Sequence, residues 1–256
     1  MEIESRPRLK WIGKATAVLL FGLVACNSGP DAPTESTPID PATAGKIRVT
    51  VKYDGTVPRN KEINMQSAPA CAKAHDGAVL DPAMLVKDGR LANAIVWIKS
   101  GFEKYVFAPP ATPVEVDQIG CMFAPRVAVT MVHQPLSFVN SDAEAHNVHG
   151  KPEVVSGWNF LISRKGARRE VVFDKPEVAV PVGCDIHPWM RAYVGIVSNP
   201  FYGVTPDDGT VDLSGVPPGT YGIGIWHEKL GILERQVELA ASGEVSVEVT
   251  YPQAAQ

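Results

Sequence analysis

The feature that most constrains how this chain folds is the short stretch from Gly183 to Arg191. Within it, Cys184, His187 and Met190 follow the spacing Cys-x-x-His-x-x-Met. The runs on either side of the stretch are rich in Val and Ile, which favours strands. Cys184 is therefore expected at the end of one strand, with His187 and Met190 in the hairpin loop beyond it. The spacing predicts that a thiol, an imidazole and a thioether converge on one point.

These donor types suit a copper ion that cycles between two oxidation states. A thiolate and two imidazoles in a trigonal plane, with a weak thioether on the axis, are typical of copper, whereas structural zinc sites favour four strong ligands. The second imidazole has to come from another strand. His146 is the best candidate, because it follows a strand-like run that ends near Asn140. We therefore expect one copper ion bound by His146, Cys184, His187 and Met190.

The segment His146-Asn147-Val148-His149, together with the loop that begins at Cys184, resembles the type 1 blue-copper proteins, the cupredoxins. The loop has the short spacing found in the amicyanins of that family, whereas plastocyanins and azurins use longer loops. The resemblance implies that His146 is a ligand and that His149 is not. It also implies that Asn147 lies behind the ligands, with its backbone N–H bonding the thiolate and its side chain tying the ligand strand to the ligand loop.

The same resemblance implies a carrier of single electrons and no enzymatic activity, since all four copper positions are filled by the protein. Electrons would pass through a ring edge of His187 exposed within an apolar patch that includes Pro188 and Trp189, to a redox protein that binds transiently. Two alternatives stay open at this stage. One is a protein that buffers or delivers copper, and the other is a non-redox envelope scaffold with a degenerate copper site.

The N-terminal residues predict export. Residues 1–25 place four basic side chains before an apolar run that is too short to span a bilayer, which is typical of a signal peptide. The run Leu23-Val24-Ala25-Cys26 resembles a bacterial lipobox, which implies a lipidated Cys26 and an anchor in the cell envelope, at the outer membrane. Residues 26–45 are rich in Pro, Ser, Thr and Asp and are expected to form a flexible tether.

The chain contains four cysteines. With Cys26 assigned to lipid and Cys184 to metal, Cys71 and Cys121 are expected to form a disulfide in an oxidising compartment. A centre with two copper ions and two cysteines is disfavoured, because it needs both thiolates in one loop.

The rest of the chain predicts an all-β fold. Short strand-like runs separated by turns indicate a Greek-key sandwich over residues 46–198, with Trp97, Phe138 and Phe173 in its core. Residues 199–256 resemble the carboxypeptidase regulatory-like, transthyretin-like β-modules, and His227 within them is expected at the surface. Residues 81–86 are the best candidate for a short helix. The net charge of −4 and the lack of a basic stripe exclude a nucleic-acid partner, and the oligomeric state is not predicted.

Overall fold

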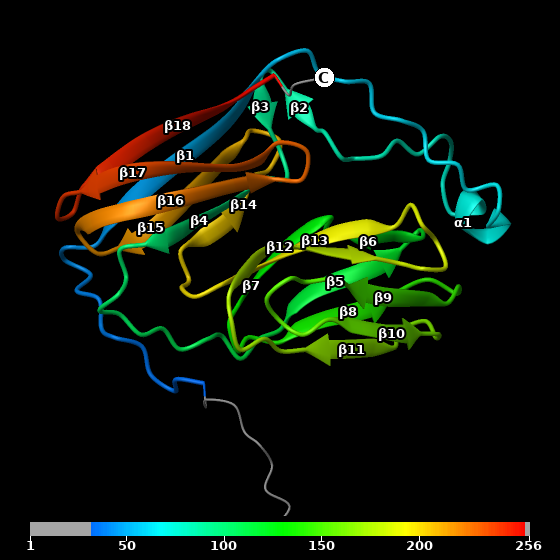
Figure 1. The fold of residues 1–256 in the computed structure, drawn as a ribbon, viewed down its shortest axis with the longest axis horizontal. Helices are drawn as coiled ribbons and strands as arrows, with labels where there is room; N and C mark the ends of the chain where they lie inside the picture. The colour runs from blue at the N-terminus through cyan, green and yellow to red at the C-terminus, as the bar shows by residue number, and fades with distance from the viewer. Residues whose placement is uncertain (1–31, 254–256) are drawn as a thin grey trace, which may run out of the picture.

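The computed structural model describes residues 32–253, which form two β-lobes that lie side by side (Figure 1). The predicted all-β class is confirmed. The predicted signal peptide and Cys26 lie outside the described residues. Within the described part, no helix is long and apolar enough to cross a membrane.

The central lobe is built from strands β5 to β13, which form two sheets around one apolar core. The first sheet has the order β10 (Trp158–Ile162), β9 (His146–Gly150), β12 (Glu177–Gly183), β13 (Arg191–Val197) and β7 (Val127–Met131). The second has the order β11 (Arg168–Val171), β8 (Leu136–Asn140), β5 (Val114–Ile119) and β6 (Met122–Ala124). Val116 and Phe138 from one sheet share the core with Val148 and Val194 from the other, so the two sheets form a sandwich.

The terminal lobe joins the two ends of the described chain around a second core. One sheet contains β15 (Thr210–Val216), β1 (Gly45–Asp54), β3 (Arg90–Leu91) and β2 (Val86–Lys87), with β18 (Glu244–Pro252) paired to β1. The other has the order β14 (Tyr202–Val204), β4 (Ile95–Ser100), β16 (Gly219–His227) and β17 (Gly231–Leu239). Strand β1 shows why these strands form, because Ile47, Val49 and Val51 are fully buried and alternate with polar residues that face outward.

This arrangement corrects the predicted domain boundaries. Strand β1 pairs in parallel with β18 along its length and antiparallel with β15, and β4 pairs with β14 and β16. The early strands therefore belong with residues 202–252 and not with the sandwich predicted for residues 46–198. The central lobe is an insertion between β4 and β14. The predicted core residues Trp97, Phe138 and Phe173 are all buried, with Trp97 in the terminal lobe.

The segment from Gly55 to Leu85, which we call the cap, leaves the terminal lobe and reaches one end of the central lobe (Figure 1). It contains the short helix α1 (Pro69–Lys73) and otherwise has little regular structure. The helix predicted at residues 81–86 is wrong, since that segment holds a turn and the start of β2. A proline at the start of α1 fits the first helical turn, where its missing N–H is not needed.

The predicted tether is shorter than residues 26–45. The backbone N–H of Thr37 donates to the carbonyl of Val106, Ser36 accepts from Ala108, and Ile39 packs against the terminal core. The chain is therefore held to the folded part from about Ser36 onward, because its own short polar side chains bond to the loop before β5.

A buried ion pair joins the two lobes. Arg126, just before β7, forms a two-pronged pair with Glu228, just after β16, and its second nitrogen lies 2.9 Å from a carboxylate oxygen. The Arg126 and Glu228 side chains are 6% and 1% exposed, and Asp81 of the cap lies 3.2 Å from the same guanidinium. This charged contact fixes the central lobe, the terminal lobe and the cap to one another.

Candidate metal centre

Backbone pairing brings the two predicted ligand segments together. Strand β9 begins at His146, and β12 ends at Gly183, directly before Cys184. The two strands are neighbours, with Gly183 opposite His149. The loop that carries His187 follows β12 and returns into β13, which pairs with β12 as far as Arg191. The hairpin and the separate histidine strand are therefore placed as the sequence predicted.

Three of the four predicted ligands converge on one point. The Nδ1 atoms of His146 and His187 lie 3.0 Å apart, and the Sγ of Cys184 lies 3.8 Å from the Nδ1 of His187. The donor atoms of all three residues lie within 4.8 Å of one another. Their exposed fractions are 0% for His146, 3% for Cys184 and 6% for His187. Two nitrogens and one sulfur thus face a common point that is shielded from water.

Met190 closes the loop. Its backbone N–H donates to the carbonyl of His187 at 2.9 Å, and its carbonyl accepts from the backbone N–H of Cys184 at 3.3 Å. The Met190 side chain is fully buried in the same apolar cluster as Cys184. These bonds tie the two ends of the loop together.

The surroundings of Cys184 lower the pKa of its thiol. Burial alone would raise its pKa, but hydrogen bonds from His146 and from the backbone N–H groups of Asn147, His187 and Ile186 outweigh burial and lower it. For His146 the two effects on the pKa act in the opposite directions. Burial alone would lower its pKa, but its bonds to Cys184 and Asp142 raise it. The pKa of His187 is lowered by burial and by the nearby His146. A thiol of lowered pKa beside two imidazole nitrogens is a donor set that suits a copper ion.

Asn147 takes the structural role expected of it. Its side-chain oxygen accepts from the backbone N–H of Asp185 at 2.5 Å, and its amide nitrogen donates to the carboxylate of Asp185 at 2.9 Å. The ligand strand and the ligand loop are therefore tied together directly behind Cys184. His149 turns away to the same carboxylate, with its Nδ1 3.0 Å from Asp185, and is not part of the donor cluster.

Sequence reasoning missed Asp142. Its carboxylate lies 2.9 Å from the Nε2 of His146 and also accepts from the backbone N–H groups of Gly120 and Cys121 at 2.7 and 2.8 Å. A carboxylate on the far nitrogen fixes the ring orientation of a metal-binding histidine and makes it a stronger donor. The signal was present in the sequence, since Asp142 lies four residues before His146 at the end of a strand-like run.

The predicted disulfide between Cys71 and Cys121 is confirmed, with a sequence separation of 50 residues. It lies against the site, because the Sγ of Cys71 is 3.5 Å from the Nε2 of His187. The indole N–H of Trp189 donates to the carbonyl of Cys121 at 3.1 Å, which ties the ligand loop to the turn between β5 and β6.

The cap corrects the predicted electron-transfer surface. The ring edge of His187 is not exposed, because the disulfide and the Trp189 ring cover it, the latter with its centroid 5.2 Å away. Of the predicted patch, Pro188 is exposed and Trp189 is partly exposed. The part of the cover that comes from the disulfide could not be foreseen from the loop, because Cys71 and Cys121 lie far upstream of it.

Comparison with known proteins gives distant structural similarity only. No protein-family model and no curated protein sequence matches the chain. A purple cupredoxin from Nitrosopumilus maritimus is similar at 19% identity, over 32% of this chain and 98% of that protein, with a TM-score of 0.29. A reduced mutant of amicyanin is similar at 19% identity, over 40% of this chain and 97% of that protein, with a TM-score of 0.30.

A Cu-containing nitrite reductase from Thermus scotoductus is similar at 22% identity, over 47% of this chain, with a TM-score of 0.31. The match spans 27% of the nitrite reductase. The assignment of a metal site to this chain therefore rests on its own donor geometry.

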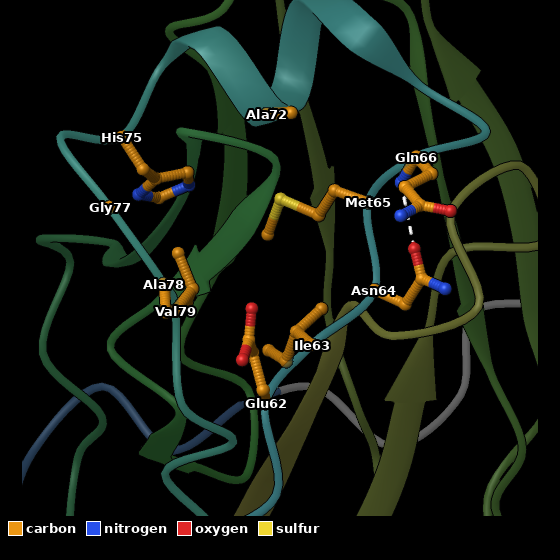
Figure 2. A pocket seen from close by; sticks show the side chains of 10 residues that line it. All are labelled: Glu62, Ile63, Asn64, Met65, Gln66, Ala72, His75, Gly77, Ala78 and Val79. Carbon is orange, nitrogen blue, oxygen red and sulfur yellow. Dashed lines mark hydrogen bonds between the residues drawn. The ribbon is translucent and has the colours of Figure 1, made fainter.

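The described residues form a hollow in the cap and another at the ligand loop. The first, of about 440 Å³, lies within the cap, and Figure 2 shows the side chains of Met65, Glu62 and His75 around it. The second, of about 410 Å³, is lined by residues that include Cys184, Met190 and Arg191.

Proposed function

We propose that His146, Cys184, His187 and Met190 hold one type 1 copper ion and that the protein carries single electrons. The observation that carries the proposal is the convergence of two Nδ1 atoms and one buried thiol of lowered pKa on one point. A bound copper ion would supply one-electron redox chemistry there.

The chain's own residues would hold the copper donors rigidly in place. His146 is fixed by Asp142, the Cys184 turn is fixed by Asn147 and by the backbone of Met190, and His187 is held beneath the cap. Donors that are already in place need little rearrangement when the charge at the site changes. The buried thioether of Met190 would be the weak axial donor.

The surface route for electrons would run through Trp189 and Pro188. The Trp189 ring contacts His187 and is partly exposed, whereas His187 itself is covered. A partner redox protein would dock there in a small, transient contact. Since the protein would supply all four donors, the proposal includes no substrate position and no enzymatic activity.

The cell envelope is the proposed location, with lipid on Cys26 as the anchor. The described structure supports this only through the buried disulfide, a bond that persists in oxidising compartments. Mass analysis of the purified protein tests it, because acylation should be lost in Cys26→Ala. An unmodified Cys26 in the wild-type protein would contradict the anchor.

A visible absorption spectrum with copper(II) is the decisive test of the metal site. We expect an intense thiolate-to-copper band in the wild-type protein and its complete loss in Cys184→Ser. His146→Gln should weaken or abolish the band, while the matched variant His149→Gln should keep it, because His149 faces Asp185 instead of the donor cluster. Equal loss in the two histidine variants would contradict the ligand assignment.

Electron transport and copper handling are separated by exchange experiments. An electron carrier with a covered site should exchange electrons rapidly with a small redox partner and lose copper slowly to a chelator. Rapid loss of copper to the chelator, with slow electron exchange, would favour copper buffering or delivery instead.

A further inference from the structure

The disulfide that covers His187 brings a second set of metal donors together. Cys71, Cys121 and His187 offer two sulfurs and the Nε2 nitrogen, all within 4.8 Å of one another. This nitrogen is distinct from the one that faces Cys184, because the Nδ1 of His187 points to the proposed copper site and its Nε2 lies 3.5 Å from Cys71. One imidazole therefore stands between two donor clusters.

We propose that reduction of the Cys71–Cys121 disulfide creates a second site, which binds one copper(I) ion through both cysteine sulfurs with the Nε2 of His187 beside them. The inference rests on the proposed function only through His187, which belongs to both donor sets, because neither cysteine belongs to the Cys184 cluster. It also differs in chemistry, since this site forms only when the disulfide is broken.

The donor types at this second site favour copper(I) over other metal ions. Thiolates are soft ligands, and soft ligands favour copper(I) over magnesium, calcium or manganese. Structural zinc sites need four strong donors, whereas this cluster offers three. The exposed fractions of Cys71 and Cys121 are 1% and 2%, so the ion would be shielded from water.

A competing cluster around Cys121 is less suitable. Cys121 also lies near Asp142 and His146, but that carboxylate already accepts from two backbone N–H groups and faces the His146 ring. A carboxylate is moreover a hard donor that copper(I) binds weakly. The Cys71 side is therefore the preferred one.

The cap can open to admit a reductant. It is held to the central lobe by the disulfide, by a hydrogen bond between the His75 ring and the carbonyl of Gly120 at 2.7 Å, and by the ion pair between Asp81 and Arg126. Most of its residues up to α1 are exposed, and segments with few buried contacts open at low free-energy cost. The hollow in Figure 2 lies beside α1, with Ala72, the neighbour of Cys71, in its wall.

The chemistry balances with a dithiol as reductant. The dithiol breaks the S–S bond by exchange, is itself oxidised to a disulfide, and passes its two protons to the sulfurs of Cys71 and Cys121. Copper(I) then forms a bond to each sulfur, the two thiol protons pass to the solvent, and the oxidation state of the copper does not change.

The test is a copper(I) titration of the full chain under anaerobic conditions, against a chromophoric copper(I) chelator. The Cys184→Ser background removes the first site, and the disulfide is either intact or reduced, as verified by alkylation and mass. We expect the reduced form to retain one copper(I) per chain at least 100-fold more tightly than the oxidised form. Addition of Cys71→Ser and Cys121→Ser should abolish that retention.

Wild-type protein provides a second measurement that does not depend on the folding of a variant. Its copper(I) stoichiometry should rise from one to two on reduction, and bound copper(I) should protect two additional thiols from alkylation. Equal retention in both redox forms, retention in the double serine variant, or a disulfide that resists reduction in the folded protein would each overturn the proposal. A failure of the visible spectrum in oxidised protein would instead count against the first site alone.

Discussion

His146 in the central lobe and His227 in the terminal lobe are both fully buried, yet their surroundings are opposite. Both ring nitrogens of His146 have partners, and its pKa is raised despite burial. The Nδ1 of His227 accepts from the backbone N–H of Lys229 at 3.3 Å, but its Nε2 has no hydrogen-bond partner among the described residues. Burial, followed by the charge of Arg126, lowers the pKa of His227 to about 4.

The difference shows that burial alone does not make a metal ligand. A buried histidine becomes a candidate ligand when a second group orients its ring and other donors share its open nitrogen. His146 meets both conditions, whereas His227 is held by Lys229 but shares its open nitrogen with no other donor among the described residues. The prediction that His227 lies on the surface is wrong, because its position at the end of β16 is covered by the residues that follow it.

The largest expected effect is at the ion pair between the lobes. Glu228→Gln leaves the buried Arg126 guanidinium without its main counter-charge, so we expect a loss of about 3 kcal/mol in the free energy of unfolding, measured by chemical denaturation. Asp81, 3.2 Å away, keeps the loss at the low end for a broken buried pair. The matched control is Glu234→Gln, which breaks an exposed pair with Lys99 and should cost less than about 1 kcal/mol. Equal losses of unfolding free energy in the two variants would show that burial does not increase the contribution of the ion pair to stability.

The pH dependence of stability tests the lowered pKa of His227, the property in which it differs from His146. The pKa of His227 is lower in the folded state than its ordinary value of 6.5, so the unfolded chain binds a proton first as the pH falls. The metal-free wild-type protein should therefore lose up to roughly 1.4 kcal/mol per pH unit from this group between pH 6.5 and about 4. Unfolding free energies of wild type and His227→Gln, compared from pH 7 to pH 4, measure the difference. Parallel curves would contradict the burial of a neutral His227.

The third prediction removes the group that orients His146. Asp142→Asn should weaken copper binding by about 10- to 100-fold in a chelator competition, because the imidazole loses its carboxylate partner. Asp76→Asn removes the same charge from an exposed position on the cap and should leave the affinity unchanged. An unchanged affinity in Asp142→Asn would mean that the loop alone orients the ring.

The smallest expected effect is at His149. Its contact with Asp185 is partly exposed, with side-chain exposures of 29% and 52%, so His149→Gln should change the free energy of unfolding by less than about 1 kcal/mol. A loss of several kcal/mol would place His149 in the structural framework of the site.

The sequence predicted the features that depend on residues close together in the chain. The loop from Cys184 to Met190 and the strands around it follow from nearby residues, and the Cys71–Cys121 bond followed from assigning the other two cysteines. The pairing of β1 with β15 and β18 was not predictable, because many β-runs share the same alternation and nothing in it selects a distant partner. The position of the disulfide against His187 was missed for the same reason, since Cys71 comes from a cap whose sequence has no regular periodicity.

The insertion of the central lobe between two paired strands, β4 and β14, has a consequence for the order of folding. The segment that forms the central lobe emerges before β15 to β18, whereas Arg48 of β1 must wait for Asp212, which is 164 residues later. We therefore expect the inner lobe to fold first and the outer one to close around the chain ends last. Most of β1 remains an open edge until nearly all of the chain has emerged, which exposes it to pairing with other chains.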